Sequence, residues 1–267
     1  MRTWWKIIAA VTLAVAGVYA SLAMADAPLM GVVVMHGKGG SPQRNVAELA
    51  DDLSARGYLV ENLEMAWSGD RDYDVDVAKA ESEVADALAR LRERGAAKLF
   101  VAGHSQGGAF ALHLAGVLPF DGAICIAPGG NVASSKFTEA LGESVAKARA
   151  LIAEGKGGEK ARLMDFEGSK GPYPVVATPA DYLTWFDPAG AMNMKRAARA
   201  VNPAVPVLWL VAARDYPGLR KFNIPMFKDL PSHPLTRMAE PDSDHIGAPS
   251  ASLDEIVRWT SEVARQP

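Results

Sequence analysis

Short runs of consecutive apolar residues alternate with longer amphipathic segments along most of the chain. The apolar runs predict buried strands, at residues 29–35, 58–65, 98–102, 122–127, 205–212 and, more weakly, 235–240. The amphipathic segments repeat apolar residues every three or four positions and predict helices, at residues 42–56, 77–94, 106–118 and 252–264. Continuously apolar strands that alternate with helices indicate an α/β fold, in which helices cover both faces of a mostly parallel sheet.

The interval from Asn131 to Asn202 interrupts this alternation. It contains no convincing strand pattern, and it predicts a helix over 136–154 and a second helical segment around 180–186, with the polar stretch EGKGGEKAR between them. We therefore expect an inserted helical lid at about residues 131–202 that packs over the edge of the sheet. No internal repeat or long linker is evident, so residues 26–267 are expected to form a single domain.

The first 25 residues differ from the rest of the chain in their charge and hydrophobicity. MRTWWK carries two basic residues, an uncharged run IIAAVTLAVAGVYASLA follows, and Ala23-Met24-Ala25 offers small residues at a cleavage site. This pattern predicts a secretory signal peptide at residues 1–25 and an exported protein, periplasmic or secreted. The alternative is an N-terminal membrane anchor, since the 19 residues from Ile7 to Ala25 are long enough to span a bilayer.

Composition and charge narrow the choice of partner. The full chain has 28 Lys+Arg and 31 Asp+Glu, a net charge of −3; removal of Arg2 and Lys6 with the signal peptide gives 26 − 31 = −5. A mildly acidic chain without a basic cluster disfavours nucleic acid and stable attachment to an anionic membrane. The single cysteine, Cys125, lies in an apolar run and excludes an intramolecular disulfide. The sequence does not indicate an oligomeric state.

Ser105 lies in the pentapeptide Gly103-His104-Ser105-Gln106-Gly107, between a predicted strand and a predicted helix. A sharp strand-to-helix turn requires small residues two positions before and after its centre, because the chain folds back on itself there. Such a turn raises the serine hydroxyl above the sheet and leaves the next main-chain N–H free at a helix N-terminus. This context favours a nucleophilic serine over a plain glycine-rich turn.

A nucleophilic serine requires a base, and the chain has five histidines. We favour His245, in the loop PDSDHIGAP between the last strand and the last helix, because that loop follows the carboxyl end of a strand. His233 precedes the same strand and is expected at the opposite edge of the sheet. His104 lies on the same turn as the serine and is poorly placed to accept its proton, while His113 falls within the following helix.

The base in turn needs an orienting acid, for which Asp215 is the strongest candidate. It follows the apolar run VPVLWLVAAR and so is expected at the carboxyl edge of the sheet, where sites form in parallel sheets. Asp242 and Asp244 are too close in sequence to His245 to reach its far nitrogen easily. Asp187, within the insertion, is the less anchored alternative.

A tetrahedral intermediate also requires main-chain donors for its oxyanion. We assign one to the N–H of Gln106, directly after the serine, and the other to the N–H of Lys38 in the glycine-rich loop HGKGGSP. That loop lacks the spacing of a phosphate-binding P-loop, because Lys38 is followed by glycine rather than by serine or threonine. We expect no metal site and no cofactor.

Taken together, these residues resemble the α/β-hydrolase family of serine hydrolases, with its esterases and lipases. His36-Gly37 matches the family's oxyanion loop, the pentapeptide around Ser105 matches its nucleophile elbow, and Asp215 and His245 match its acid and base in order. The resemblance covers about residues 29–264 and implies a lid after the strand that ends near Ala127. One departure is that only about six strands are evident, without the two that usually precede the oxyanion loop.

The expected function is hydrolysis of a small carboxylic ester or thioester through an acyl-enzyme on Ser105. The alternatives are a peptidase or amidase on the same fold, or a non-catalytic protein that retains the fold and binds a ligand. Apolar residues of the insertion either line an acyl or alkyl pocket or pack the lid on the body, and the sequence leaves both open: Phe137, Tyr173, Tyr182, Leu183, Trp185, Phe186, Met192 and Met194. Trp67 and Tyr73, in a loop at the same edge of the sheet, likewise either contact the substrate or serve only in packing.

Overall fold

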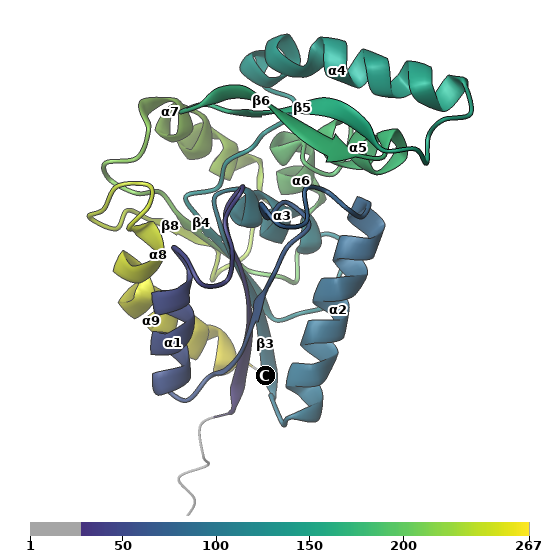
Figure 1. Cartoon of the computed structure of the whole chain (residues 1–267). Coiled ribbons are helices and arrows are strands. Elements are labelled where there is room, and N and C mark those ends of the chain that lie inside the picture. The colour runs from purple at the N-terminus through teal and green to yellow at the C-terminus, as the bar shows by residue number, and fades with distance from the viewer. Residues whose placement is uncertain (1–27, 267) are drawn as a thin grey trace, which may run out of the picture.

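The computed structural model describes residues 28–266 of the chain. The predicted signal peptide, or alternative anchor, at residues 1–25 lies outside this part. A parallel sheet forms the centre of the molecule, and helices cover both of its faces (Figure 1). The predicted α/β fold class is therefore confirmed. Within residues 28–266, none of the helices combines the length and the apolar character needed to cross a membrane.

The main sheet has six strands, and every neighbouring pair is parallel. In spatial order they are β2 (Leu59–Leu63), β1 (Met30–Met35), β3 (Lys98–His104), β4 (Gly122–Ile126), β7 (Val207–Leu210) and β8 (Arg237–Ala239). All six correspond to predicted strands, with ends shifted by a few residues. Because the strands are parallel, their carboxyl ends meet at one edge of the sheet.

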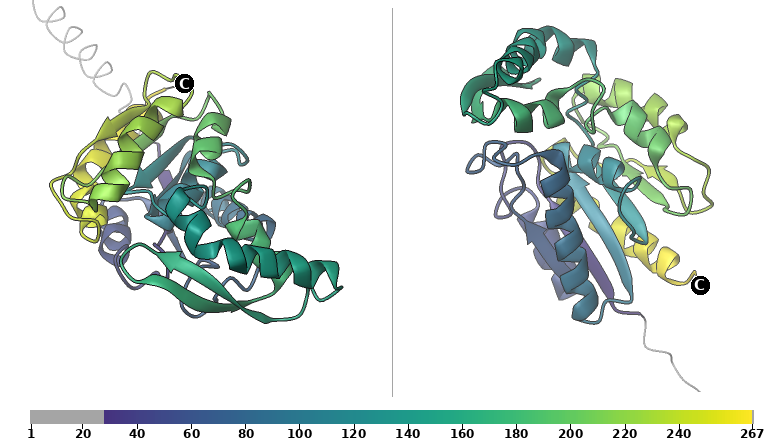
Figure 2. Two further views of the ribbon diagram at one scale, coloured as in Figure 1. Left: turned by 90° about the horizontal axis from the view of Figure 1, so that it is seen from above. Right: turned by 90° about the vertical axis from the view of Figure 1, so that its right-hand side faces the viewer.

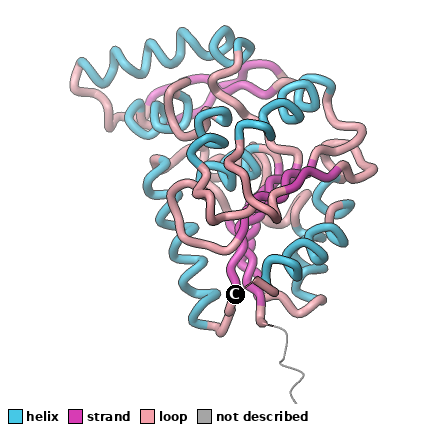
Figure 3. The backbone as a smooth tube through the Cα atoms, turned by 180° about the vertical axis from the view of Figure 1, so that it is seen from behind, coloured by secondary structure: helices cyan, strands magenta, loops and turns pink. Residues whose placement is uncertain are grey.

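Alternate residues of each strand contribute to two separate hydrophobic cores. Val32 and Val34 of β1 pack with α1 (Ala47–Ala55) and α9 (Leu253–Ala264), whereas Val33 and Met35 face the opposite core. That second core contains α2 (Val77–Glu93), α3 (Gln106–Leu114) and α6 (Met194–Ala200). The strands thus run between two helical layers, as the magenta strands show in Figure 3.

The helices begin where the backbone finds a suitable first turn. α2 begins after Asp76, whose side chain accepts a hydrogen bond from the N–H of Lys79. α1 begins at Ala47 rather than at the predicted Pro42, because residues 41–47 form successive tight turns instead: the N–H of Arg44 donates to Ser41 and that of Ala47 to Arg44. α8 (Ala248–Ala251) is a short additional helix before α9.

The insertion between β4 and β7 is not purely helical, which corrects the sequence-based expectation. The predicted helices are present as α4 (Ser135–Ala153) and α5 (Pro179–Phe186), but β5 (Ala161–Glu167) and β6 (Gly171–Ala177) lie between them as an antiparallel hairpin. Two prolines in β6 and several charged residues in β5 obscured the strand pattern. Inward and outward residues nevertheless alternate in both strands, with both prolines exposed.

We call residues 135–186, from α4 to α5, the cap segment. It lies above the carboxyl edge of the main sheet (Figures 1 and 2). Its aromatic residues were expected either to line a pocket or to pack the segment on the body. Tyr182, Trp185 and Phe186 pack the segment on the body and are almost fully buried. The indole N–H of Trp185 donates to the carbonyl of Val75, and its ring meets that of Trp67 edge to face. The cap segment therefore shares a hydrophobic core with the sheet.

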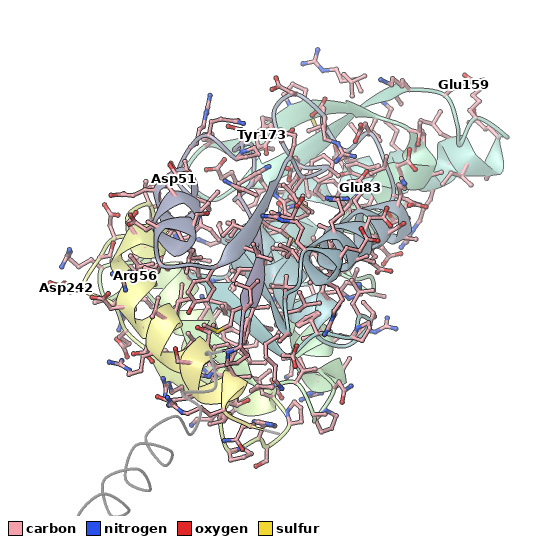
Figure 4. All side chains as sticks on the ribbon, turned by 90° about the horizontal axis from the view of Figure 1, so that it is seen from below. Asp51, Arg56, Glu83, Glu159, Tyr173 and Asp242 are labelled. Carbon is pink, nitrogen blue, oxygen red and sulfur yellow. The ribbon has the colours of Figure 1, made fainter. Side chains whose placement is uncertain are left out.

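Charged side chains are concentrated on the outside of the molecule, as the labelled residues of Figure 4 illustrate. Arg56, after α1, pairs there with Asp254 of α9, and both side chains are exposed. Exposed pairs of this kind contribute little to stability. The fold therefore depends mainly on its two apolar cores, and buried charged residues are exceptions that call for an explanation.

Candidate active site

Ser105 occupies the turn between β3 and α3 in a strained backbone conformation. Its φ of 54° and ψ of −114° lie outside the regions that residues with a side chain normally adopt. The turn is held by two bonds, from the N–H of Ser105 to Ile126 and from the N–H of Gly129 to the carbonyl of Ser105. Backbone strain at a residue that is held this firmly is typical of functional sites.

The two glycines that flank the serine are required by close backbone contacts. A Cβ atom on Gly103 would lie 2.1 Å from the carbonyl oxygen of Gly107. A Cβ atom on Gly107 would lie 2.7 Å from the carbonyl oxygens of both Met35 and His36. The sequence-based argument for small residues at these positions thus has a direct steric basis.

Ser105, His245 and Asp215 form a continuous chain of hydrogen bonds. The Ser105 Oγ atom is 3.0 Å from His245 Nε2, and His245 Nδ1 is 2.8 Å from Asp215 Oδ1. Because a carboxylate only accepts, Nδ1 carries a proton and Nε2 is free to accept from the serine hydroxyl. The Asp215 side chain is fully buried, and its Oδ1 atom also accepts from the N–H of Tyr216.

Neighbouring strands bring these residues together. Asp215 follows β7, His245 follows β8, and the two strands are adjacent and parallel. Beyond the strands, the loops continue side by side, because the N–H of Arg214 donates to Ser243 and Arg214 forms a bridge with Asp244. Both loops therefore emerge at the carboxyl edge beside the turn that carries Ser105.

The alternative bases and acids lie in other environments. His233 accepts the N–H of Leu235 through Nδ1, and His113 bonds to Glu81. Asp187 pairs with Arg149, and Asp242 with Arg214. None of these four residues belongs to the hydrogen-bonded chain of Ser105, so the geometry favours Asp215 and His245 over each of them.

His104 has a structural relation to the site that the sequence did not reveal. Its Nε2–H donates to the main-chain carbonyl of His245 over 2.8 Å, and the two rings lie 4.9 Å apart. Burial, followed by the neighbouring His245, lowers the pKa of His104 to about 3, so its ring stays neutral. The only sequence signal was its position next to the serine, which indicated proximity but no role.

The loop after β1 lies directly beside the serine. A Cβ atom on Gly37 would be 3.2 Å from the Cβ atom of Ser105. His36 anchors the loop: its Nε2 accepts the N–H of Met65 and its carbonyl accepts the indole N–H of Trp67. Burial lowers the pKa of His36, which keeps its ring neutral and able to accept. Lys38 and Gln106 both line the cavity at Ser105, and their role as oxyanion donors stays a prediction.

A cavity of about 420 Å³ opens above Ser105. Its walls come from the loop after β1, the beginning of the cap segment, the hairpin and α7 (Pro217–Met226). Much of the lining is apolar: Phe137, Phe166, Met194, Leu219, Phe222, Met226 and Ile246. Gly129 leaves the space over the serine open, since a Cβ atom there would lie 3.4 Å from Ser105 Oγ.

Of the apolar residues with two possible roles, Phe137 and Met194 line this cavity, whereas Trp67 and Tyr73 are buried in the core. Burial raises the pKa of Cys125, which is inert in the interior. Across residues 28–266, no cluster of three or more His, Cys, Asp or Glu side chains is arranged to hold a metal ion.

Comparison with known proteins assigns the chain to a family. The sequence profile of the alpha/beta hydrolase family matches residues 32–260. The chain therefore belongs to the alpha/beta hydrolase family, and its sequence-based resemblance to that family is confirmed. No curated protein sequence matches the chain significantly.

Solved structures share the fold at low sequence identity. A monoacylglycerol lipase from Paleococcus ferrophilus is 19% identical with a TM-score of 0.60, over 87% of this chain and 94% of the lipase. A structure from the metagenome-derived lipolytic enzymes LipS and LipT is 21% identical with a TM-score of 0.55, over 89% and 93%. Est1E from Butyrivibrio proteoclasticus, bound to ferulic acid, is 13% identical with a TM-score of 0.57, over 89% and 92%.

Proposed function

We propose that this protein is an exported serine hydrolase that cleaves carboxylic esters or thioesters. The single observation that carries the proposal is the hydrogen-bonded chain from Ser105 through His245 to the buried Asp215. In this arrangement the three residues act as nucleophile, general base and orienting acid. A non-catalytic protein would have no need to keep a strained serine hydrogen-bonded to an imidazole that is paired with a buried carboxylate.

The reaction proceeds in two steps. Ser105 Oγ attacks the carbonyl carbon while His245 Nε2 takes its proton, and Asp215 stabilises the imidazolium that forms. The main-chain N–H groups of Lys38 and Gln106 bind the oxyanion, and His245 then protonates the departing alcohol or thiol. Water, activated by the same imidazole, attacks the acyl-enzyme and releases the acid and Ser105.

The proposed substrate has an apolar acyl or alkyl group of moderate size. The apolar lining of the cavity above Ser105 supports this choice, because such surfaces bind hydrocarbon by removing it from water. The names of structurally similar proteins, among them lipolytic enzymes and a monoacylglycerol lipase, agree with an ester substrate. Amide hydrolysis is the alternative reaction for the same residues.

The test is labelling of the purified protein with a fluorophosphonate probe, which reacts with activated serines. We expect labelling of the wild type and none of Ser105→Ala. Ester, thioester and amide substrates with the same acyl group then define the reaction, with the ester or thioester turned over fastest. Absence of both labelling and turnover in the folded wild type would contradict the proposal, and preferred amide turnover would favour the alternative.

Export is the part of the proposal that depends on residues 1–25 alone. Expression of the full chain in a bacterium, followed by fractionation and N-terminal sequencing, tests it. We expect a soluble periplasmic or secreted protein that begins at Asp26. An intact N-terminus in the membrane fraction would instead support the anchor.

A further inference from the structure

A charged residue of the cap segment is buried in contact with a residue assigned to the oxyanion hole. Asp165 of β5 has no exposed side-chain surface. It lies two residues after the buried Leu163 and so faces the same, inner side of the strand. Its Oδ1 atom accepts from Lys38 Nζ at 2.5 Å and from the N–H of Phe166 at 2.6 Å. Lys38, one of the two residues assigned to the oxyanion hole, is thus tied to the hairpin by its side chain.

The second oxygen of Asp165 leads to the other assigned residue. Oδ2 accepts from the hydroxyl of Tyr73 at 2.7 Å and from that of Tyr173 at 2.8 Å. Burial, with Asp165 nearby, raises the pKa of both tyrosines, so they remain protonated donors. With its proton directed to Asp165, the Tyr73 oxygen accepts from the side-chain Nε2 of Gln106 at 3.3 Å.

The backbone that carries Tyr73 has an unfavourable conformation. Asp72 and Tyr73 have φ values of 51° and 60°, a left-handed conformation that is uncommon for any residue but glycine and unfavourable for a bulky one. The carboxylate of Asp72 accepts the N–H of Val176 in β6, so this loop and the hairpin are joined on both sides of the buried network. In Figure 4, Glu159 lies at the outer end of the cap segment, well away from Tyr173 on β6.

Burial of a carboxylate is unfavourable unless charge and hydrogen bonds compensate for the lost water. Asp165 has full compensation, from one ammonium, two phenols and one main-chain N–H, while Lys38 also bonds to the carbonyl of Phe166 and lies over the rings of Phe137 and Phe186. A hairpin of this size can be built without a buried charge. The network is therefore better explained by what it holds in place.

We propose that Asp165 is a positioning residue for the oxyanion hole: it holds the side chains of Lys38 and, through Tyr73, of Gln106, and so fixes their main-chain N–H groups relative to Ser105. This inference rests on the proposed function, because it assigns a task to the same two donors. It makes the cap segment a structural part of the catalytic centre. The hairpin acts from above on donors that come from the loop after β1 and from the first turn of α3.

The consequence concerns the transition state more than substrate binding. An oxyanion donor is used fully only when the carbonyl oxygen has become an anion, and loss of one donor costs about 10²–10³-fold in kcat in other hydrolases. A displacement of about 1 Å has effects of about 10²-fold. Release of the Lys38 side chain allows the glycine-rich loop to move without removing its N–H groups, so we expect an intermediate loss.

Asp165→Asn is the direct test, with kcat and KM measured for a p-nitrophenyl ester. We expect kcat to fall about 10- to 100-fold with KM changed less than about threefold. Affinity for a trifluoromethyl ketone, whose hydrated or serine-bound form mimics the oxyanion, should fall by the same factor as kcat/KM. A purely structural role for Asp165 would not produce this parallel loss.

Two further variants change a side chain of the buried network and leave the main-chain N–H donors in place. Lys38→Met keeps the main-chain N–H and removes only the ammonium, so a similar fall in kcat would come from loop position alone. The kcat of the double variant Lys38→Met/Asp165→Asn should fall no further than that of the worse single variant, because both substitutions remove the same contact between Lys38 and Asp165. Tyr73→Phe, which keeps the buried ring, serves if Asp165→Asn folds poorly, with an expected fall of about threefold to tenfold.

Asp187→Asn is the matched control. Like Asp165, Asp187 is a carboxylate that pairs with a basic residue, Arg149, but it follows α5 and lies outside the cavity above Ser105. Its kcat should stay within about twofold of the wild type. A kcat for Asp165→Asn equal to that of the control, or a rise in KM alone, would overturn the positioning role while the proposed function stands. A wild type without turnover or fluorophosphonate labelling would remove the proposed function, and this inference with it.

Discussion

His104 donates a hydrogen bond from its buried imidazole to the main-chain carbonyl of His245, over 2.8 Å. The residue before the proposed nucleophile thus holds the backbone of the proposed base. This bond joins the turn after β3 to the loop after β8, two parts of the chain that are 141 residues apart. Burial and the neighbouring His245 keep this ring neutral by lowering its pKa, and the lowered pKa makes the stability of the protein dependent on pH.

The first prediction concerns that pH dependence. The folded pKa of His104 is lowered to about 3, whereas an unfolded histidine titrates near 6.5. Between these values the unfolded state binds more protons, so stability is complete above about pH 6.5 and decreases as the pH falls towards 3. At pH 5 the loss from this one residue is about 2 kcal/mol.

His104→Gln offers the comparison, because its amide N–H can donate to the same carbonyl but does not titrate. Urea denaturation at pH 7.5 and pH 5 should show a smaller loss of unfolding free energy for the variant. His36, whose pKa is also lowered by burial, contributes equally to both proteins and cancels in the difference. Equal losses in the two proteins would show that His104 does not resist protonation.

The second prediction concerns the orientation of His245. Asp215→Asn places an amide beside Nδ1, and its NH₂ group favours the tautomer with the proton on Nε2, which cannot accept from Ser105. We expect kcat for an ester substrate to fall about 10⁴-fold, with little change in thermal stability. Asp187→Asn should retain activity, and a large loss there with an active Asp215→Asn would mean that Asp187 is the acid.

The third prediction separates the strain at Ser105 from its chemistry. Ser105→Ala and Ser105→Gly both remove the hydroxyl, and both should reduce ester hydrolysis by at least about 10⁴-fold. Only glycine adopts a φ of 54° with this ψ without strain, so Ser105→Gly should be about 1 kcal/mol more stable than Ser105→Ala. Thermal unfolding measures the difference, and a less stable glycine variant would refute the strain.

The fourth prediction compares two glycine-to-alanine changes in helices. Gly107→Ala would place a Cβ atom 2.7 Å from the carbonyl oxygens of Met35 and His36, and we expect a loss of about 3 kcal/mol. Gly142→Ala in α4 meets nothing within 4 Å and should stabilise the protein by about 0.5–1 kcal/mol. Urea denaturation checks both, and similar effects would contradict the close contact at the elbow.

The sequence predicted the sheet and its flanking helices because the two apolar cores impose strong periodicities on the chain. Each buried strand reads as an apolar run, and each covering helix has one apolar face. The hairpin β5–β6 was missed because one of its faces is exposed and carries Pro172 and Pro174, while its inner face includes the charge of Asp165. The pairing of the two strands, and not their composition, makes them a hairpin.

The residues of the candidate site were also predicted from the sequence on two different grounds. Ser105 was identified from five consecutive residues, because the steric needs of a tight turn are local and leave a local pattern. Asp215 and His245 were nominated from their places after two strands, since parallel strands bring their carboxyl ends to one edge. Their catalytic roles remain predictions, which the variants above test.

By itself, the sequence determined the α/β class, the order of the strands along the chain and the turn around Ser105, because these follow from periodicity and short-range sterics. Only the tertiary structure decided that Lys38 and Asp165, 127 residues apart, form a buried pair, and that His104 holds His245. Such contacts depend on how separate loops meet in space. A lone lysine or aspartate in a sequence carries no sign of the partner that makes its burial favourable.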